Sequence, residues 1–348
     1  MQKHLSERKG TKQKGTALIS VLLIFAVCTV LAVEMQERQH LDIRRTTNIM
    51  ARDQAYLYSA AAEEIAIAGL NEDLKADKKN GVEKDHLGEE WHKEKSLPVE
   101  GGAVTASLVE LQGKFNINAL LASNQDHKKE AQIIFKKLME DLGLPKSEEG
   151  AMPVSDMYHM VLEWMDPDDE NDGSLVEGED YYYQGLEVPY RTSNNYMTNI
   201  SELRLIRGFT DADIAELEDY VVFIPPDAPL NVNTVEDTLA AILMDDGATA
   251  IVSDRPEKGW EHIDDIPKPS ASTTTPPPVP APRDITIPHA VYSEYFLLTA
   301  TVTINQRTVT NKSVIYRPRE PDKNNPIRVI MRDRGRQFHY LKKAKLQN

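Results

Sequence analysis

The chain has 348 residues, of which 41% are hydrophobic, so it is long enough to bury a substantial core. Its formal net charge of −15 argues against a surface built to grip nucleic acid or anionic phospholipid. The single cysteine, Cys28, excludes an intrachain disulfide, and the sequence lacks CxxC, HExxH, GxxxxGK[ST] and GxSxG motifs. We therefore expect a protein that is not an enzyme.

The N-terminus is basic and leads directly into an apolar run. Residues 1–15 carry a net charge of +4, from Lys3, Arg8, Lys9, Lys12 and Lys14 against Glu7. The uncharged run 17–33 would form about 25 Å of helix, and it spans a bilayer core of about 30 Å if its neighbours contribute. Because basic residues precede the run, we expect its start in the cytoplasm and the chain after Glu34 to be exported.

A secretory signal peptide is the alternative interpretation of this region. Its apolar core should be about 7–15 residues long and should end at a small-x-small cleavage site. Here the run is longer, and neither proline nor glycine interrupts the chain from Met35 until Gly69. Apolar residues such as Tyr58 and Ile65 recur at helical spacing. The sequence thus predicts one continuous helix over residues 16–70, whose apolar stripe needs a partner to cover it.

A short basic leader that ends in glycine before a long apolar helix resembles a type IV prepilin. In that family a prepilin peptidase cuts after the glycine on the cytoplasmic side and methylates the new N-terminus. The matching residues are Gly15 and Thr16, so the leader would comprise residues 1–15. Cleavage after Gly10 would instead leave two lysines in the membrane segment, at a cost of a few kcal/mol.

Most prepilins carry glutamate at the fifth mature position, where this chain has Ser20. A buried carboxylate in a membrane helix needs a cationic partner, which in pilins is the N-terminal amine of the subunit ahead. A subunit with no neighbour ahead does not need the glutamate. Its absence resembles the K-type pseudopilin of type II secretion systems, which caps the tip of the pseudopilus.

The exported part reads as an α+β domain with an insertion. Alternating apolar and polar residues predict its strands: 102–111, 295–304, 308–316 and 327–331. Two N-x-N units, in 114–120 and 230–235, bracket a long stretch that looks helical and loop-like.

We therefore predict an inserted helical domain, 117–228, within an αβ domain made of 71–116 and 229–348. The αβ domain contains a proline-rich segment, 267–282, whose composition cannot bury a core and predicts an exposed, extended loop.

Four phrases resemble the K-type pseudopilin family in the same order: GKFNINAL, VLEWMDPDDE, PYRTSNNYMTNISELRLIRG and LNVNTVEDTLAAIL. The resemblance implies a pseudopilin fold with a long N-terminal transmembrane helix, an antiparallel sheet and a large inserted α-helical domain. It implies a minor pseudopilin at the pseudopilus tip that assists export of folded proteins across the outer membrane. Its partners would be the I-type and J-type minor pseudopilins and the major pseudopilin, with an inner-membrane anchor and a periplasmic C-terminal domain.

Residues 166–180, DPDDENDGSLVEGED, contain eight acidic side chains and no basic one. The flanking Trp164 and the tyrosines 181–183 suggest that both ends of this segment pack. Ordered like charges repel one another, and a bound hard cation removes the repulsion. Since calcium takes six to eight oxygen ligands in a flexible cage, this segment is a candidate Ca²⁺ site; the alternative is a solvated acidic loop.

Two ligand registers are open for this site. Residues 168–179 fit D-x-E-x-D-G-x5-E, close to an EF-hand loop, although Pro167 is poor for a continuous entering helix. The K-type resemblance instead implies the following ligands, which we favour: Asp166, Asp168, Glu177 and Asp180. Further candidates are Asp172, Glu179 and Asn194.

Other functions are weaker interpretations of the sequence. Residues 201–213 resemble a helix-hairpin-helix, but the second glycine is missing and acids lie where phosphate would bind, so we expect no nucleic-acid partner. The alternative function is a minor pilin of a type IV pilus system, whose exported part is usually smaller and often carries a C-terminal disulfide. A membrane-anchored hydrolase would need histidine or cysteine converging with carboxylates, and the histidines stand in unrelated contexts.

Overall fold

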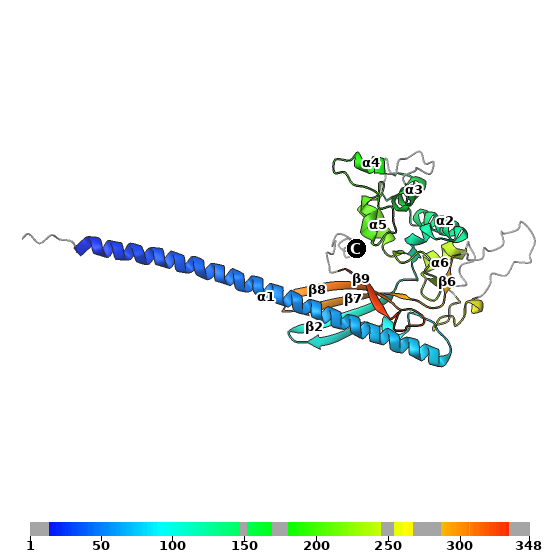
Figure 1. Ribbon diagram of the computed structural model, residues 1–348, viewed down its shortest axis with the longest axis horizontal. Coiled ribbons are helices and arrows are strands. Elements are labelled where there is room, and N and C mark those ends of the chain that lie inside the picture. Colours follow the sequence, from blue (N-terminus) through cyan, green and yellow to red (C-terminus); the bar gives the residue numbers. More distant parts are fainter. Residues whose placement is uncertain are drawn as a thin grey trace, which may run out of the picture.

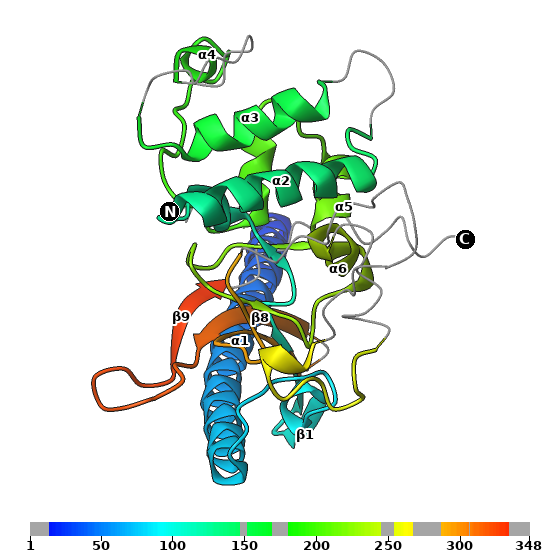
Figure 2. The same ribbon diagram turned by 90° about the vertical axis from the view of Figure 1, so that its right-hand side faces the viewer.

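The computed structural model describes residues 14–146, 152–168, 180–244, 254–266, 287–305 and 307–333. The architecture is α+β, as predicted. A long N-terminal helix, α1, projects far beyond the rest of the molecule, and a sheet lies against its second half. The other α-helices gather on the other side of the sheet, away from α1 (Figure 1 and Figure 2).

Helix α1 spans Lys14–Asn80 as one continuous element. Its most apolar part has a mean hydropathy of 2.6, is unburied, and is long and apolar enough to cross a membrane. The helix extends beyond the predicted end at residue 70, because Gly69 is tolerated and the next glycine, Gly81, is the one in the left-handed region at φ 77°. The Val82 N–H donates to the Asp77 carbonyl at 3.2 Å, which closes the helix end in a glycine cap.

Five antiparallel strands form the main sheet, in the order β1-β2-β7-β8-β9. Their bounds are β1 Lys95–Val99, β2 Gly102–Glu110, β7 Tyr295–Ile304, β8 Arg307–Tyr316 and β9 Arg328–Asp333. The four predicted strands are confirmed, whereas the sequence did not indicate β1. This edge strand is mostly exposed and contains Pro98, so it has neither the alternation nor the composition that marks a strand.

Small residues let α1 approach the sheet closely. Ala51, Ala55 and Ala62 are buried against strand side chains that include Val104 and Val302. Further along α1, Leu70 packs with these side chains from the sheet and the preceding loop: Trp91, Leu108, Phe296 and Ile315. Burial of this stripe fixes the second half of α1 on the sheet, while its first half remains exposed.

Buried polar pairs set the register of α1 on the sheet. Asn311 donates to Ser59 and Ser313 donates to Glu63, each at 2.6 Å. Arg332 on β9 also reaches Glu63, with donor distances of 2.8–3.0 Å. Because these side chains lie on strands β8 and β9, the helix is tied to the sheet edge opposite β1.

The first N-x-N unit closes the predicted insertion. Strand β3 (Phe115–Asn116) pairs in parallel with β4 (Val221–Val222). Asn116 and Asn118 bridge the two ends, since both donate to backbone carbonyls of residues 224–225 at 2.8–3.0 Å. Between β3 and β4 the chain forms η2 Ile117–Leu121, α2 Gln125–Asp141, α3 Val154–Met165, α4 Asp180–Gln184, η3 Ile200–Leu205 and α5 Asp211–Leu217.

The second N-x-N unit closes a second excursion in the same way. Strand β5 (Leu230–Asn231) pairs in parallel with β6 (His289–Ala290). Asn233 donates to the carbonyls of Trp260 and Val291 at 3.1 and 3.2 Å, and the Trp260 N–H donates back at 2.7 Å. This excursion contains α6 (Asp237–Met244) and η4 (Ile263–Asp265).

A hydrophobic cluster continues across the domain boundary predicted at residue 229. Leu239, Leu243 and Trp260 are buried in the same cluster as side chains of α2 and α3, and we call the helices α2 to α6 the helical unit. The sequence could not show this, because the apolar face of a single short helix does not reveal which layer covers it. The proline-rich segment, 267–282, lies outside the described residues.

The segment that resembles a helix-hairpin-helix is a packing unit. Its apolar side chains Leu203, Ile206 and Ile214 are fully buried in the helical core. Asp213 accepts from the Thr210 N–H at 2.8 Å and from the Lys146 N–H at 2.7 Å, so this acid caps α5 and anchors a neighbouring loop.

Candidate functional site

The predicted calcium segment begins at the C-terminal end of α3. Asp166 caps that helix: its N–H donates to the Leu162 carbonyl at 2.8 Å, and its Oδ1 accepts from the Asp168 N–H at 3.4 Å. The unsatisfied carbonyls of a helix C-terminus carry a partial negative charge, which adds to these two carboxylates. Three of the candidate ligands lie outside the described residues: Asp172, Glu177 and Glu179.

Both ends of the acidic segment are packed, as the aromatic residues predicted. Trp164 and Tyr183 are buried, with ring centroids 5.4 Å apart at nearly perpendicular planes. Tyr181 is the exception, since it is 80% exposed. Asn194, in the left-handed region at φ 44°, donates its N–H to the Trp164 carbonyl at 3.1 Å and its side-chain amide to the Asp168 carbonyl at 3.5 Å. Asn194 therefore lies against the Asp166–Asp168 stretch.

Asp180 is held by protein donors at the other end of the segment. Its Oδ1 accepts from the Thr192 N–H and hydroxyl, both at 2.9 Å, and its Oδ2 accepts from Gln184 at 3.1 Å. Burial is the largest single effect on the pKa of this carboxyl and raises it, but the Thr192 and Gln184 donors and the Arg191 guanidinium together outweigh burial and lower the pKa. Asp180 is thus a fixed carboxylate whose oxygens already have partners.

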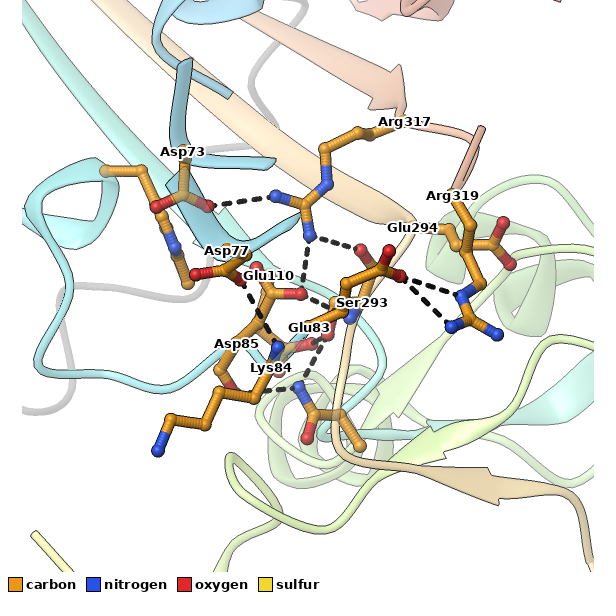
Figure 3. Close-up of polar contacts among 12 residues, drawn as sticks. Asp73, Asp77, Glu83, Lys84, Asp85, Glu110, Ser293, Glu294, Arg317 and Arg319 are labelled. Atoms are coloured by element: carbon orange, nitrogen blue, oxygen red, sulfur yellow. Dashed lines mark hydrogen bonds and ion pairs between the residues drawn. The ribbon is translucent and has the colours of Figure 1, made fainter. Parts of the chain in front are cut away.

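A second polar cluster joins the end of α1 to the sheet, and we call it the junction cluster (Figure 3). Its centre is Arg317, which follows β8 and is 3% exposed. Its guanidinium donates to Asp73 at 3.0 Å, to Asp85, and to the Ser293 carbonyl at 2.8 Å. The guanidinium also stacks 4.7 Å from the Phe296 ring centroid. These contacts bring together α1, the loop that follows it, and strands β7 and β8.

Polar bonds extend the junction cluster toward β2 and the second N-x-N unit. The Ser293 N–H donates to Asp85 and its hydroxyl to Glu110, both at 2.7 Å. Asn231 donates to the Ser293 hydroxyl at 2.7 Å and to the Asp85 carbonyl at 3.2 Å. Sequence reasoning missed this cluster, since Arg317 and Asp85 lie far apart in the chain and no local motif links them.

Burial dominates the electrostatics of the junction cluster. Desolvation raises the pKa of Asp73 to about 6, with the Asp85 charge adding and Arg317 opposing. Desolvation likewise raises the pKa of Glu89 to about 8, with Asp85 and Asp73 adding. Arg317 is itself disfavoured by burial, but Asp85 and Asp73 outweigh that effect and raise its pKa. The acids here outnumber the buried cation.

Comparisons with known proteins agree on one family. Residues 113–226 match the family model described as type II secretion system protein K. The type II secretion system protein K of Aeromonas hydrophila is 34% identical over 72% of this chain and 78% of its own length. That of Pseudomonas aeruginosa is 32% identical over 94% of both chains.

A solved structure supports the same assignment. The chain matches, with a TM-score of 0.67 and 25% identity, a chain in the crystal structure of the GspK-GspI-GspJ complex of enterotoxigenic Escherichia coli. The match covers 84% of this chain and the whole of the other. These findings favour type II secretion over the type IV pilus alternative. The chain belongs to the type II secretion system protein K family and is a minor pseudopilin of that system.

Proposed function

We propose that this minor pseudopilin caps the tip of the pseudopilus and assists export of folded proteins across the outer membrane. The observation that carries the proposal is the position of the helical unit, which lies far from the membrane end of α1 (Figure 1). The role is structural, with α1 anchored in the inner membrane and the domains after it in the periplasm.

The tip position follows from how pilin-type subunits pack in a fibre. Their apolar helices line the fibre core, and each subunit is covered by the subunit above it. In the proposed arrangement the helical unit, which lies away from the membrane end of α1, would block the addition of another subunit above this one (Figure 1). Ser20 supports the same position, because a tip subunit has no neighbour whose N-terminal amine would need a glutamate.

We further propose that α1 binds the I-type and J-type minor pseudopilins, beneath which the major pseudopilin would assemble. The relative of known structure is solved as a complex with GspI and GspJ. On the half of α1 that lies on the sheet, Leu57 and Ile65 are 71% and 54% exposed, and Ala61 lies between them on the same helical face. An exposed apolar stripe of this kind is suited to burial against a partner helix.

The full-length chain in detergent should co-purify with both minor pseudopilins as a heterotrimer. Leu57→Asp together with Ile65→Asp should weaken the complex at least tenfold, because two charges would be buried at the interface. Size-exclusion chromatography with multi-angle light scattering would measure the assembly. The control is Glu140→Gln, an exposed acid on α2 and not on α1. A wild-type chain that stays monomeric beside both partners at micromolar concentration would refute this proposal.

We also propose that residues 166–180 bind calcium. Asp166 and Asp168 lie beside the negative end of α3, and Trp164 and Asn194 order that end, so the like charges are held close. Holding several carboxylates protonated at neutral pH is costly, since each unit of pKa shift costs about 1.4 kcal/mol. A hard cation with oxygen ligands relieves the repulsion without protonation.

Calcium should raise the melting temperature of the full-length chain, and a chelator should lower it. Binding to the folded state alone adds about 2.7 kcal/mol at a hundredfold excess over Kd. Asp166→Asn with Asp168→Asn should reduce the calcium-dependent rise in melting temperature, while Glu187→Gln, an exposed acid outside the segment, should leave the rise unchanged. If Asp172→Asn and Glu179→Gln reduce the rise and Asp166→Asn does not, the EF-hand register is correct. If millimolar calcium does not change the melting temperature, the proposal is wrong and the alternative interpretation, a solvated acidic loop, is correct.

A further inference from the structure

Three carboxylates converge where the chain leaves α1 and turns toward the sheet. Asp73 comes from the last turns of α1, Asp85 from the loop after it, and Glu89 from the residue before the short helix η1 (Glu90–His92). Each offers an oxygen within 4.8 Å of the oxygens of the other two. This group, which lies within the junction cluster, is separate from the acidic segment 166–180.

The cations of the junction cluster do not balance these acids. Arg317 is the buried cation, and it is shared between Asp73 and Asp85. Glu89 accepts from the Trp91 indole N–H and faces His86, whose Nε2 lies 3.5 Å from its carboxylate. The surrounding charged groups pair elsewhere: Lys84 with Glu261, and Arg319 with Glu83. Asp77, which accepts from the Lys84 N–H, adds a further negative charge nearby.

The buried carboxylate of Asp85 is an observation independent of this convergence. The residue is 1% exposed, and one of its carboxylate oxygens is occupied by Arg317 and the Ser293 N–H. The other oxygen, Oδ1, is buried and has no hydrogen-bond partner within the described part of the chain. A buried carboxylate oxygen without a partner is costly, so a bound group that accepts its lone pair accounts for it.

We propose that Asp73, Asp85 and Glu89 bind a calcium ion that fastens the end of α1 to the loop leading into the sheet. Calcium–oxygen distances are about 2.3–2.6 Å, so three oxygens that all lie within 4.8 Å of one another can share one calcium ion. Magnesium holds its oxygens at about 2.0–2.1 Å and needs a tighter octahedron. Zinc prefers nitrogen and sulfur ligands.

The ion would join the end of helix α1 to the chain segment that follows it. Its first ligand lies in α1, and the other two lie between the glycine cap at Gly81 and η1. Arg317 approaches Asp73 and Asp85 from the β8 side, and the ion would join the same two acids to Glu89. Binding should therefore order the helix end against the sheet, independently of the tip function and of the 166–180 segment.

Terbium, a luminescent hard cation, can test this site in the full-length chain solubilised in detergent. The parent carries Asp166→Asn and Asp168→Asn, which remove the proposed ligands of the other site. The chain has three tryptophans, and Trp91 contacts the Glu89 carboxylate. Excitation of tryptophan should sensitise terbium emission, and calcium should displace the terbium. Trp91→Phe should remove most of that emission, whereas Trp164→Phe and Trp260→Phe should preserve it.

Glu89→Gln should weaken terbium and calcium binding at least tenfold, and the matched control Glu90→Gln, an exposed acid next to it, should bind like the parent. Glu89 is chosen because it does not hold Arg317, so its replacement leaves the central ion pairs in place. Emission that survives Trp91→Phe, or equal affinity of Glu89→Gln and the parent, would overturn the proposal. Either result would show that Asp73, Asp85 and Glu89 do not hold the bound cation. Neither readout depends on secretion or on the other minor pseudopilins.

Discussion

Arg317→Met should lower the free energy of unfolding by about 3–5 kcal/mol, the usual cost of leaving a buried charge without its partner. The side chain is 3% exposed and donates to Asp73, Asp85 and the Ser293 carbonyl. Methionine retains the contact with Phe296 but leaves two acids that have little access to water. Because those acids come from α1 and the loop after it, the helix end should loosen from the sheet first.

Urea denaturation of the full-length chain in detergent, with a chelator present, would measure the loss. The control is Arg319→Met: Arg319 is half exposed and pairs with Glu83, so its loss should cost less than about 1 kcal/mol. Arg317→Met combined with Asp85→Asn should recover part of the stability, since the second change removes one of the stranded charges. Equal losses for the Arg317 and Arg319 variants would contradict a buried role for Arg317.

The elements that the sequence predicted are those whose signal is local. An uncharged run followed by a stretch without proline or glycine predicted α1, and strict alternation predicted β2, β7 and β8. The two N-x-N units motivated the predicted insertion, and the structure shows what their side chains do. Asn118 and Asn233 bridge chain segments that leave and return, so asparagines recur wherever an excursion must be closed.

What the sequence could not predict depends on contacts between distant segments. The apolar side chains of α6 predict that the helix is buried but do not identify its neighbour. Only the fold shows that they pack against α2 and not against the main sheet. The junction cluster joins Asp73, Asp85, Glu110 and Arg317, which are isolated charges in the sequence. For the acidic segment, the aromatic residues predicted packed ends at Trp164 and at 181–183, which is wrong for the exposed Tyr181. They could not show that Asp180 is already held by Thr192.

Gly15→Val should block maturation completely. Prepilin-type processing requires the glycine before the cut, and α1 begins at Lys14, so the Gly15–Thr16 bond lies at the very start of the helix. The uncut leader would keep its net charge of +4 on the cytoplasmic side. Those charges resist transfer into the apolar phase, so the unprocessed subunit should stay in the membrane and fail to enter the pseudopilus.

Intact-mass measurement of the protein from cells that contain the prepilin peptidase would decide the point. Wild type should begin at methylated Thr16, and Gly15→Val should retain residues 1–15. The matched control is Gly10→Val, which should be cut normally because Lys12 and Lys14 would lie in the membrane segment if the cut followed residue 10. A mature chain that starts after Val33 would instead identify an ordinary signal peptidase. In that case the apolar part of α1 would be lost, and the domains would have no anchor from which to join the fibre.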